Sequence, residues 1–433
     1  MKSGERLVAG LSGGLDSVVL LDLLSRIARR RRFTLAALHV NHQLSPNAAR
    51  WTRFCRELCR ERGIPLRVVR VSVARGDSLE AAARAARYAV YRRQRADYLA
   101  LAHNKDDQAE TFFLQLLRGA GVKGLSAMPL VREDGARNGK AGSLRAPSIL
   151  RPLLEVTRGE ILAYAAERRL KWVEDESNQD TYFLRNFLRR EVLPVIARRV
   201  PAYRATVARA AHHLAEAAGL LDVLAASDGA GSLGEDTLEV DALRRLPLPR
   251  ARNLLRYFLA SREAAMPGTE HLGEALRQAC TASADSRVCI ELGDATLRRY
   301  AGRLYVVREA GLLPAGYTRV WRGEHKVALP ELGGVLMLTR ARGAGISLAR
   351  LRSAAVTLRM RRGGERLRPD GRRPRRSLKN LLQEARVPPW ERERLPLIYC
   401  GEELVWAPGV GVAFEFQASR HERALRPVWR MAA

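Results

Sequence analysis

The chain has 433 residues, of which 75 are Lys or Arg and 46 are Asp or Glu, so its formal net charge is +29. This length, with 47% apolar residues, allows two or three domains with sizeable cores and excludes wholesale disorder. No run approaches the roughly 18 apolar residues of a membrane span, and a strand pattern begins too early for a signal peptide to precede it, so we expect a cytoplasmic protein.

The excess of basic over acidic residues predicts a polyanionic partner, with nucleic acid as the first choice. A bias toward arginine in a GC-rich genome would explain Arg in place of Lys, but it would not explain 75 bases against 46 acids. The five cysteines are too few and too scattered for a disulfide framework, so reduced, buried thiols are expected.

Residues 6 to about 120 alternate strand-like and helix-like patterns. Strands are predicted at 6–11, 33–41, 65–73 and 97–104, and helices at 17–31, 47–62, 78–95 and 106–119. Such repetition is typical of an α/β domain with a parallel sheet and helices on both faces. Because ligands of these sheets bind at the carboxyl ends of the strands, we expect the functional residues there.

The rest of the chain divides into regions of different character. Two further helices are predicted at 157–169 and 184–199, after a polar, Gly-rich loop at 131–148. Residues 201–280 are rich in Ala, Leu and Arg and look helical without intervening strands, and β-like runs follow to about residue 341. We predict a catalytic α/β domain at 1–200, a mainly helical domain at 201–312 and a mixed α+β domain at 313–433.

The first predicted strand is followed by a short string of small and polar residues, Ser12, Gly13, Gly14, Leu15, Asp16 and Ser17. Two glycines allow a tight turn whose N–H groups, with the start of the next helix, form an anion site suited to phosphate. The serines add hydroxyl donors, and Asp16 is placed to bind the Mg²⁺ that accompanies a nucleotide. A plain Gly-Gly turn with a capping Asp is the structural alternative, but the full string is more specific.

Two histidines, His39 and His42, follow the second predicted strand, where they would contact a nucleotide or serve a structural role. After the fourth strand, His103 precedes a helix whose first turns contain Asp106, Asp107 and Glu110. Acids at a helix start complement the helix dipole. Crowded beside a phosphate site, however, they are costly unless they hold a cation, for which a free amine is suitable. That amine must lose a proton before it acts as a nucleophile, and neighbouring carboxylates can assist.

The string S-G-G-L-D-S resembles the pyrophosphate-binding loop of the N-type ATP pyrophosphatases, or PP-loop family, whose domain is a Rossmann-like parallel sheet. It is not a Walker A motif. Further motifs make the chain similar to the tRNA(Ile)-lysidine synthetases: H-V-N-H, A-R-x-x-R-Y, A-H-N-K-D-D-Q-A-E-T, R-P-L-L, D-x-S-N-x-D-x-x-x-x-R-N-x-x-R and a C-terminal segment at 375–399. Two departures are Gln43, where glycine is common, and Asn104, where a second histidine is common.

This resemblance implies an ATP-dependent ligase. The carbonyl oxygen on carbon 2 of the wobble cytidine, in the CAU anticodon of isoleucine tRNA, would attack the α-phosphate of ATP and release pyrophosphate. The ε-amine of free L-lysine would then displace AMP to leave lysidine. ATP and Mg²⁺ would be the cofactors, and the domains at 201–312 and 313–433 would bind the tRNA. Neither a membrane nor a stable protein partner is implied.

The resemblance also assigns roles to residues. The Ser12–Ser17 loop and His39 would bind ATP, with Asp16 on the metal. Asp107 and Glu110 would hold and help deprotonate lysine, with His103 close by. Arg84 or Arg87, together with Arg185, would neutralise phosphate charge during adenylation.

An arginine-rich run at 359–376 is predicted to contact the tRNA backbone, or else to be a solvated loop. Its candidate contacts are Arg372, Arg373, Arg375 and Arg376, followed by Lys379. Two other functions are compatible with the fold: a thiouridine synthase, which would want reactive cysteines near the nucleotide, and a non-catalytic RNA-binding protein with a relic nucleotide fold. The absence of C-x-x-C argues against the first, and the retained acids argue against the second.

Overall fold

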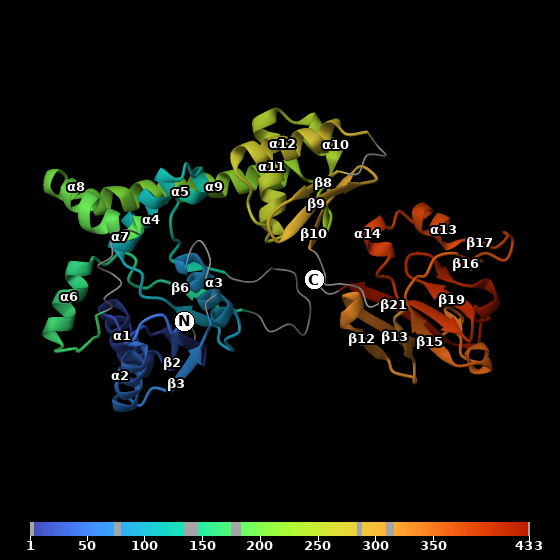
Figure 1. The fold of residues 1–433 in the computed structure, drawn as a ribbon, viewed down its shortest axis with the longest axis horizontal. Coiled ribbons are helices and arrows are strands. Elements are labelled where there is room, and N and C mark those ends of the chain that lie inside the picture. The colour runs from blue at the N-terminus through green and yellow to red at the C-terminus, as the bar shows by residue number, and fades with distance from the viewer. Residues whose placement is uncertain are drawn as a thin grey trace. The chain divides into compact units, whose positions relative to one another are not determined.

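The computed structural model describes residues 4–72, 79–133, 146–174, 183–283, 288–308 and 316–431. It divides into two compact units, Met1–Leu224 and Ala225–Ala433 (Figure 1). None of the helices in the described ranges combines the length and the apolar character that a bilayer crossing requires.

The first unit contains one six-stranded sheet with the strand order β3-β2-β1-β4-β6-β5. Its strands are β1 (Arg6–Gly10), β2 (Thr34–Asn41), β3 (Leu66–Arg70), β4 (Tyr98–Ala100), β5 (Val131–Arg132) and β6 (Ser148–Leu150). All pairs are parallel except that between β5 and β6, at the edge. The sequence prediction of a Rossmann-like parallel sheet is confirmed. The order reverses between β1 and β4, which is where such sheets bind ligands.

Helices cover both faces of this sheet. The helices are α1 (Leu15–Arg31), α2 (Ala48–Glu61), α3 (Leu79–Arg92) and α6 (Arg158–Glu167). Residues of α1, α2 and α6 share a core with Leu7 and Ala9 of β1, whereas Val8 packs into a separate core with tyrosines of α3. The alternation of side chains along β1 therefore supplies both cores, as expected for a strand buried on two faces.

A second group of helices follows β4 and β6 in the chain. It comprises α4 (Lys105–Leu117), α5 (Val122–Leu125), α7 (Leu184–Phe187), the π-helical turn η2 (Leu188–Val192), α8 (Leu193–Arg199) and α9 (Tyr203–Asp228). Ala109 of α4, Leu193 of α8 and Tyr203 of α9 form a small core that joins them. This core fixes α4 and η2 against each other, and the candidate site depends on that contact.

The first part of the second unit contains three helices, α10 (Val240–Arg245), α11 (Leu248–Ser261) and α12 (Thr269–Thr281), packed on an antiparallel sheet. The sheet contains β7 (Thr237–Glu239), β8 (Cys289–Glu291), β9 (Ala295–Tyr300) and β10 (Arg303–Arg308). The expectation of an unbroken helical stretch at 201–280 is wrong at β7. This strand of three residues forms by pairing with β10, as Thr237 with Tyr305, and so has no local sequence signal.

The last part of the second unit is built mainly of antiparallel strands. One sheet contains β11 (Thr318–Val320), β15 (Val356–Arg359), β18 (Leu397–Cys400), β19 (Glu403–Ala407) and β20 (Gly411–Val412). Another contains β12 (Lys326–Leu329), β13 (Gly334–Arg342), β14 (Ile346–Ser347) and β21 (Arg423–Met431), and a third contains β16 (Arg366–Leu367) and β17 (Arg376–Ser377). With α13 (Leu378–Glu384) and α14 (Pro389–Arg392), they confirm the predicted α+β character.

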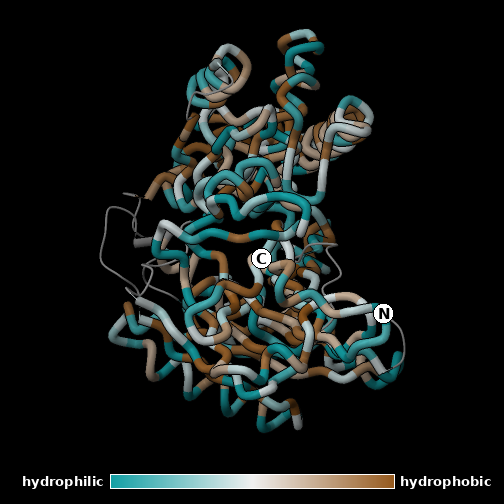
Figure 2. The backbone as a smooth tube through the Cα atoms, turned by 90° about the vertical axis from the view of Figure 1, so that its right-hand side faces the viewer, coloured by the Kyte–Doolittle hydropathy of each residue, from teal (hydrophilic) through white to brown (hydrophobic). Residues whose placement is uncertain are grey.

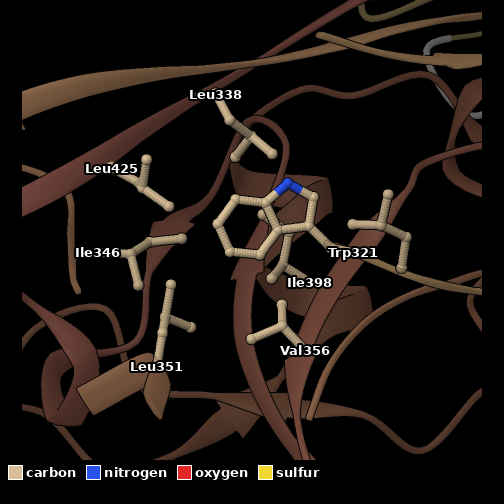
Figure 3. A pocket seen from close by; sticks show the side chains of 8 residues that line it. Trp321, Leu338, Ile346, Leu351, Val356, Ile398 and Leu425 are labelled. Atoms are coloured by element: carbon tan, nitrogen blue, oxygen red, sulfur yellow. The ribbon is translucent and has the colours of Figure 1, made fainter. Parts of the chain in front are cut away.

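Apolar side chains of these sheets form one large core. Figure 2 shows hydrophobic stretches inside the fold and hydrophilic stretches on outer loops. In Figure 3 the Trp321 ring lies among Leu338, Ile346, Ile398 and other aliphatic side chains. Together these side chains line a void of about 10 Å³. A dry, apolar void that small is a packing gap in the core rather than a ligand site.

Candidate active site

The loop between β1 and α1 closes on its own side chains. The Ser17 hydroxyl accepts hydrogen bonds from the N–H groups of Ser12 and Gly13, both at 3.2 Å. It donates a hydrogen bond to the Gly14 carbonyl oxygen at 2.9 Å. Ser12 Oγ lies 3.0 Å from Ser17 Oγ and accepts the Gly14 N–H. The first N–H groups of α1, which begins at Leu15, have no acceptors inside the helix. Hydroxyl groups and a helix N-terminus thus meet at one point, an arrangement that binds phosphate.

Position 13 of this loop requires glycine. Gly13 has φ +95°, and a Cβ there would lie 2.9 Å from Val173 Cγ2 and 3.2 Å from Cys55 Sγ. Its carbonyl accepts the N–H of Val173 over 3.0 Å. Gly14, in contrast, has φ −72° and ordinary space around it. Of the two glycines, only Gly13 is needed for the conformation, because the loop is wedged there between α2 and the segment after α6.

Asp16, in the first turn of α1, has one carboxylate oxygen without a partner. Oδ1 is buried and unpaired among the described residues, while Oδ2 lies 4.0 Å from Arg158 Nη1. Burial raises the pKa of this carboxyl, which Arg158 opposes and the nearby Asp107 reinforces. No group of three or more potential metal ligands occurs in the described ranges. The unpaired oxygen nevertheless fits Mg²⁺, which proteins often hold through one or two carboxylates and substrate phosphates.

Both ring nitrogens of His39 are used inside the fold. Nδ1 lies 2.9 Å from the Leu11 carbonyl oxygen, and Nε2 lies 3.1 Å from Thr52 Oγ1. Burial lowers the pKa of the imidazole, so the ring is neutral at pH 7. His39 therefore fastens the end of β1 to α2. Its ATP contact stays a prediction, and such a contact would use the ring face, since both nitrogens are occupied.

His42, three residues on, is approached by α3. Arg87 Nε donates to His42 Nε2 over 3.3 Å, and burial, with Arg87 and His39, lowers the pKa of His42 to about 4. The next residue, Gln43, has φ +57°, and its N–H donates to Asn41 Oδ1 over 2.8 Å. This left-handed conformation favours glycine, which explains why glycine is common at the position where this chain has Gln43.

His103 follows β4 and is surrounded by arginines. Burial, together with the charges of Arg151, Arg185, Arg84 and Arg87, lowers the pKa of His103 to about 3. Its Nδ1 is buried and has no partner in the described part of the chain. His103 is therefore a neutral group with a free ring nitrogen, in surroundings that favour an anion.

Asn104 begins α4 through a capping box. Its Oδ1 accepts the Asp107 N–H over 3.0 Å, and Asp107 Oδ2 accepts the Asn104 N–H over 3.1 Å. The second departure is thus a good N-cap residue. Asp106 binds neighbouring helices, because Oδ2 accepts the Arg158 N–H over 2.8 Å and Oδ1 pairs with Arg204. Two of the three acids at this helix start therefore have structural partners.

Asp107 and Glu110 also meet two arginines. Arg185 donates to Glu110 Oε2 over 2.8 Å and to Asp107 Oδ1 over 3.0 Å, and Arg189 donates to Glu110 Oε1 over 2.6 Å. The Glu110 residue is only 2% exposed. In this structure the cations that the two acids hold are guanidinium groups of the chain itself. The network of Asp107, Glu110, Arg185 and Arg189 is called the acid–arginine network below.

Arg189 is the last arginine of the D-x-S-N-x-D-x-x-x-x-R-N-x-x-R motif, and it was given no role from the sequence. The available signal was the spacing R-N-x-x-R, which places Arg185 and Arg189 four residues apart on one helix face. Arg189 lies in η2, a rare π-helical turn of the kind often found at functional sites. Asp175, Ser177, Asn178 and Asp180, in the same motif, lie outside the described residues.

Arg84 and Arg87 are exposed on α3 and have different hydrogen-bond partners. Arg87 reaches His42, at the end of β2. Arg84 lies over the Tyr88 ring, 5.1 Å from its centroid, and donates to the Tyr88 hydroxyl over 3.5 Å. The structure thus places Arg87 on the side of β2 and Arg84 with Tyr88.

The arginine run of the second unit is partly neutralised by acids. Arg375 lies 3.5 Å from Glu415, Arg373 lies 3.7 Å from Asp370, and Arg376 pairs with Glu384. Arg372 and Lys379 are exposed, and within the described ranges no carboxylate lies within 4 Å of their side-chain nitrogens. A groove of about 460 Å³ opens beside this run and is lined by Arg362, Arg366, Arg368 and Arg375, among others.

Comparison with known proteins gives three family matches. Residues 2–196 match a PP-loop domain, residues 238–305 a TilS substrate binding domain, and residues 356–429 a TilS substrate C-terminal domain. The tRNA(Ile)-lysidine synthase of Nitrosomonas europaea is 44% identical over 99% of this chain and 93% of the relative. Those of Azoarcus sp. and Coxiella burnetii are 43% and 38% identical, each over 98% of this chain and 92% of the relative.

Proposed function

The chain belongs to the tRNA(Ile)-lysidine synthase family, and on that premise we propose how its side chains divide the reaction. The protein is an ATP-dependent ligase that forms lysidine at the wobble cytidine of tRNA(Ile). In our proposal, the cytidine O2 of a CAU anticodon attacks the α-phosphate of ATP and releases pyrophosphate. Free L-lysine then displaces AMP through its ε-amine. ATP, tRNA and lysine are all available in the cytoplasm, where we place the reaction.

The Ser12–Ser17 loop would bind the pyrophosphate part of ATP. The Ser17 hydroxyl, which holds the amides of Ser12 and Gly13, is positioned to exchange those contacts for phosphate oxygens. Asp16 would hold Mg²⁺ through its unpaired Oδ1. When bound, this ion would offset the negative charge of the departing pyrophosphate.

Positive side chains would stabilise the charge that develops at the α-phosphate. Arg185, on the acid–arginine network, and Arg87, near the end of β2, are held by Glu110 and His42 respectively. Because their partners fix these guanidinium groups in advance, little reorganisation is needed when the phosphate charge shifts. His103, kept neutral by its surroundings, would contact the reacting groups through its free nitrogen.

One observation best supports this site: the phosphate-binding loop and the carboxylates of the acid–arginine network lie at the same edge of the sheet. Asp16 feels the charges of both Asp107 and Arg189, so the loop and the acid–arginine network share one electrostatic environment. The lysine ammonium would compete for Asp107 and Glu110 with Arg185 and Arg189. Those carboxylates would orient the amine and help to remove its proton before it attacks.

Recognition of tRNA would fall to basic residues outside this site. Arg372, Arg373, Arg375, Arg376 and Lys379 are the proposed backbone contacts in the second unit. The Arg373 and Arg375 side chains are more than half exposed. Arg372 and Lys379 are exposed and their side chains have no carboxylate partner in the described residues. These four side chains are therefore accessible to phosphates of the tRNA. The charge of +29 supports the same partner.

Sulfur transfer, the competing chemistry, finds no support in the first unit. Its two cysteines, Cys55 and Cys59, are buried. Burial raises the pKa of Cys55 to about 12 and that of Cys59 to about 11, so neither is a thiolate at pH 7. These thiols therefore behave as core residues.

The two proposed steps can be separated with Asp107→Asn, which keeps an acceptor for the capping box. With tRNA and ATP, this variant is expected to release pyrophosphate in a first turnover, whereas incorporation of labelled lysine falls at least a hundredfold. Asp241→Asn, on α10 of the second unit, is the matched control. Normal lysine incorporation by Asp107→Asn would show that the carboxylate assignment is wrong. Identification of the labelled nucleoside as lysidine completes the test.

A further inference from the structure

Arg151, directly after β6, is the largest side chain that is fully buried in the described residues, with 2% exposure. It donates to the Pro129 carbonyl oxygen over 2.6 Å, but its Nε has no partner. No carboxylate of the described ranges lies within 4 Å of it. A guanidinium group is rarely buried without an acid, because removal from water is costly unless a negative charge compensates.

The groups around Arg151 add positive charge. Tyr88 forms a hydrogen bond with it, and the charges of Arg132 and Arg84 act on it. The guanidinium groups of Arg84 and Arg132 lie over the Tyr88 ring at 5.1 and 5.0 Å from its centroid. His103, with an unpaired buried Nδ1, feels both Arg151 and Arg84. These groups offer donors and positive charge, a composition that suits a phosphate.

This cluster is separate from the Ser12–Ser17 loop. The sheet order places β4 between β1, which leads into the loop, and β6, which leads into Arg151. Because adjacent strands are about 4.8 Å apart, the end of β6 lies about 10 Å from the end of β1. His103, after β4, lies between the two. The Ser12–Ser17 loop and the cluster around Arg151 are therefore two distinct places at this edge of the sheet, with the neutral imidazole of His103 between them.

We propose that Arg151, Arg84, Tyr88 and His103 form a second phosphate site, which holds a phosphodiester of the RNA beside the cytidine that is modified. The proposal rests on the assignment of ATP to the Ser12–Ser17 loop. The reaction brings the cytidine to the α-phosphate of ATP, so two phosphate-bearing molecules approach each other. Their repulsion in a partly buried site requires positive charge on each side.

The division between Arg84 and Arg87 supports RNA rather than ATP as the ligand. Arg87 reaches the β2 side, whereas Arg84 reaches Tyr88 and, with it, the β6 side. Arg84 is exposed, so a long polymer can approach it, while Arg151 is buried beneath. An exposed and a buried guanidinium together can grip one phosphate oxygen pair at the entrance of the site.

The test combines the removal of one phosphate charge from the tRNA with the removal of the Arg84 charge from the protein, and measures the affinity for tRNA. A full-length tRNA, assembled from two halves, would contain a methylphosphonate on one or the other side of the wobble cytidine. With the native enzyme, the methylphosphonate at the proposed site is expected to weaken tRNA binding about tenfold. Arg84→Gln is expected to weaken the binding of unmodified tRNA by about the same factor. Combined, the two changes are expected to weaken binding no more than either alone. Arg92→Gln, exposed on the same helix, should show full sensitivity to the neutral linkage.

Three results would overturn the proposal. Additive losses would mean that Arg84 and the linkage do not meet, and a raised KM for ATP in Arg84→Gln with unchanged tRNA affinity would assign the phosphate to ATP. If neither ligand responds to Arg84→Gln or to Arg151→Lys, the cluster is structural, provided that thermal melting shows both variants folded. Ser12→Ala tests the ATP loop separately, because it should raise the KM for ATP and leave the RNA coupling intact.

Discussion

At the scale of single residues, Gln43 has a backbone conformation that most residues avoid. Its φ of +57° costs a non-glycine residue roughly 1–2 kcal/mol. Gln43→Gly removes this strain but adds freedom to the unfolded chain, so a net stabilisation of about 0.5–1 kcal/mol is expected in urea unfolding. Gln43→Ala keeps the strain and should change little. A loss of stability in Gln43→Gly would show that the side chain, not the backbone, matters.

Glu110 is nearly inaccessible and neutralises two arginines. Glu110→Gln leaves the two guanidinium groups with Asp107 as their one charged partner in the described residues, so it is expected to lower the free energy of unfolding by about 3 kcal/mol. Since Arg185 and Arg189 are partly exposed, solvent keeps the cost from being larger. Adding Arg189→Gln should recover part of the loss. Equal stability of the single and double variants would contradict the ion-pair network.

The pKa of His103, lowered to about 3, makes stability depend on pH. An unfolded histidine titrates near 6.5, so below that pH the unfolded chain binds a proton that the folded chain rejects. Stability is therefore present above about pH 6.5 and lost as the pH falls toward 3. Between pH 7 and pH 4.5 the loss from this residue is on the order of 2–3 kcal/mol.

Urea unfolding of His103→Asn at both pH values tests this. On going from pH 7 to pH 4.5, the variant should lose less free energy of unfolding than the native chain, the difference being on the order of 2–3 kcal/mol. His212→Asn, an exposed histidine on α9, is the control and should behave like the native chain. An identical pH dependence of His103→Asn and native protein would mean that His103 is protonated in the fold. In that case the surrounding arginines would not set its charge.

At the scale of elements, η2 aligns two sets of contacts along one helical segment. Arg185 and Arg189 face the acids of α4, and Leu193, just beyond η2, packs with Ala109 and Tyr203. A π-turn contains more residues per turn than an α-helix, so it changes which side chains face α4 after it. The segment can thereby present both charged and apolar side chains to the same neighbour.

Inserting one Ala after Arg190 tests that role. The π-turn already accommodates one extra residue, so another would rotate Leu193 by about 100° away from its core, which is expected to cost about 2–4 kcal/mol, as for a lost core side chain. Arg190→Ala keeps the length and should cost less than 0.5 kcal/mol, because Arg190 is exposed. Thermal unfolding of the two variants checks this. Equal midpoints would show that the orientation of Leu193 set by the π-turn does not matter for stability.

The strands and helices of residues 6–120 could be predicted because their signals are local. Each strand is an apolar run and each helix has an apolar face, so the parallel sheet and the position of the Ser12–Ser17 loop follow from the sequence. The ion pairs of the site join residues 75 to 82 positions apart, such as Glu110 with Arg185, and no local pattern contains them. His39 illustrates the same limit, because its structural partner Thr52 lies on another element.

At the scale of the whole molecule, the charge of +29 should appear in the salt dependence of tRNA binding. The Arg372 guanidinium has no carboxylate partner in the described residues, whereas that of Arg376 pairs with Glu384. Arg372→Gln is therefore expected to reduce the slope of log Kd against log salt by about 0.7–0.9, and Arg376→Gln by less. Filter binding between about 50 and 200 mM salt measures both slopes. An unchanged slope for Arg372→Gln would exclude a phosphate contact there.

The contact between Gly13 and Val173 has a consequence for synthesis on the ribosome. The Gly13 carbonyl and Cα are enclosed by a residue that the ribosome adds 160 positions later. Domains fold as units during translation, beginning with the N-terminal one. The nascent chain can therefore form β1 and α1 early, yet it completes the wall of its phosphate loop only after Val173 has left the exit tunnel. We therefore expect nucleotide to bind tightly only after Val173 has docked, so that it would not assist the early steps of folding.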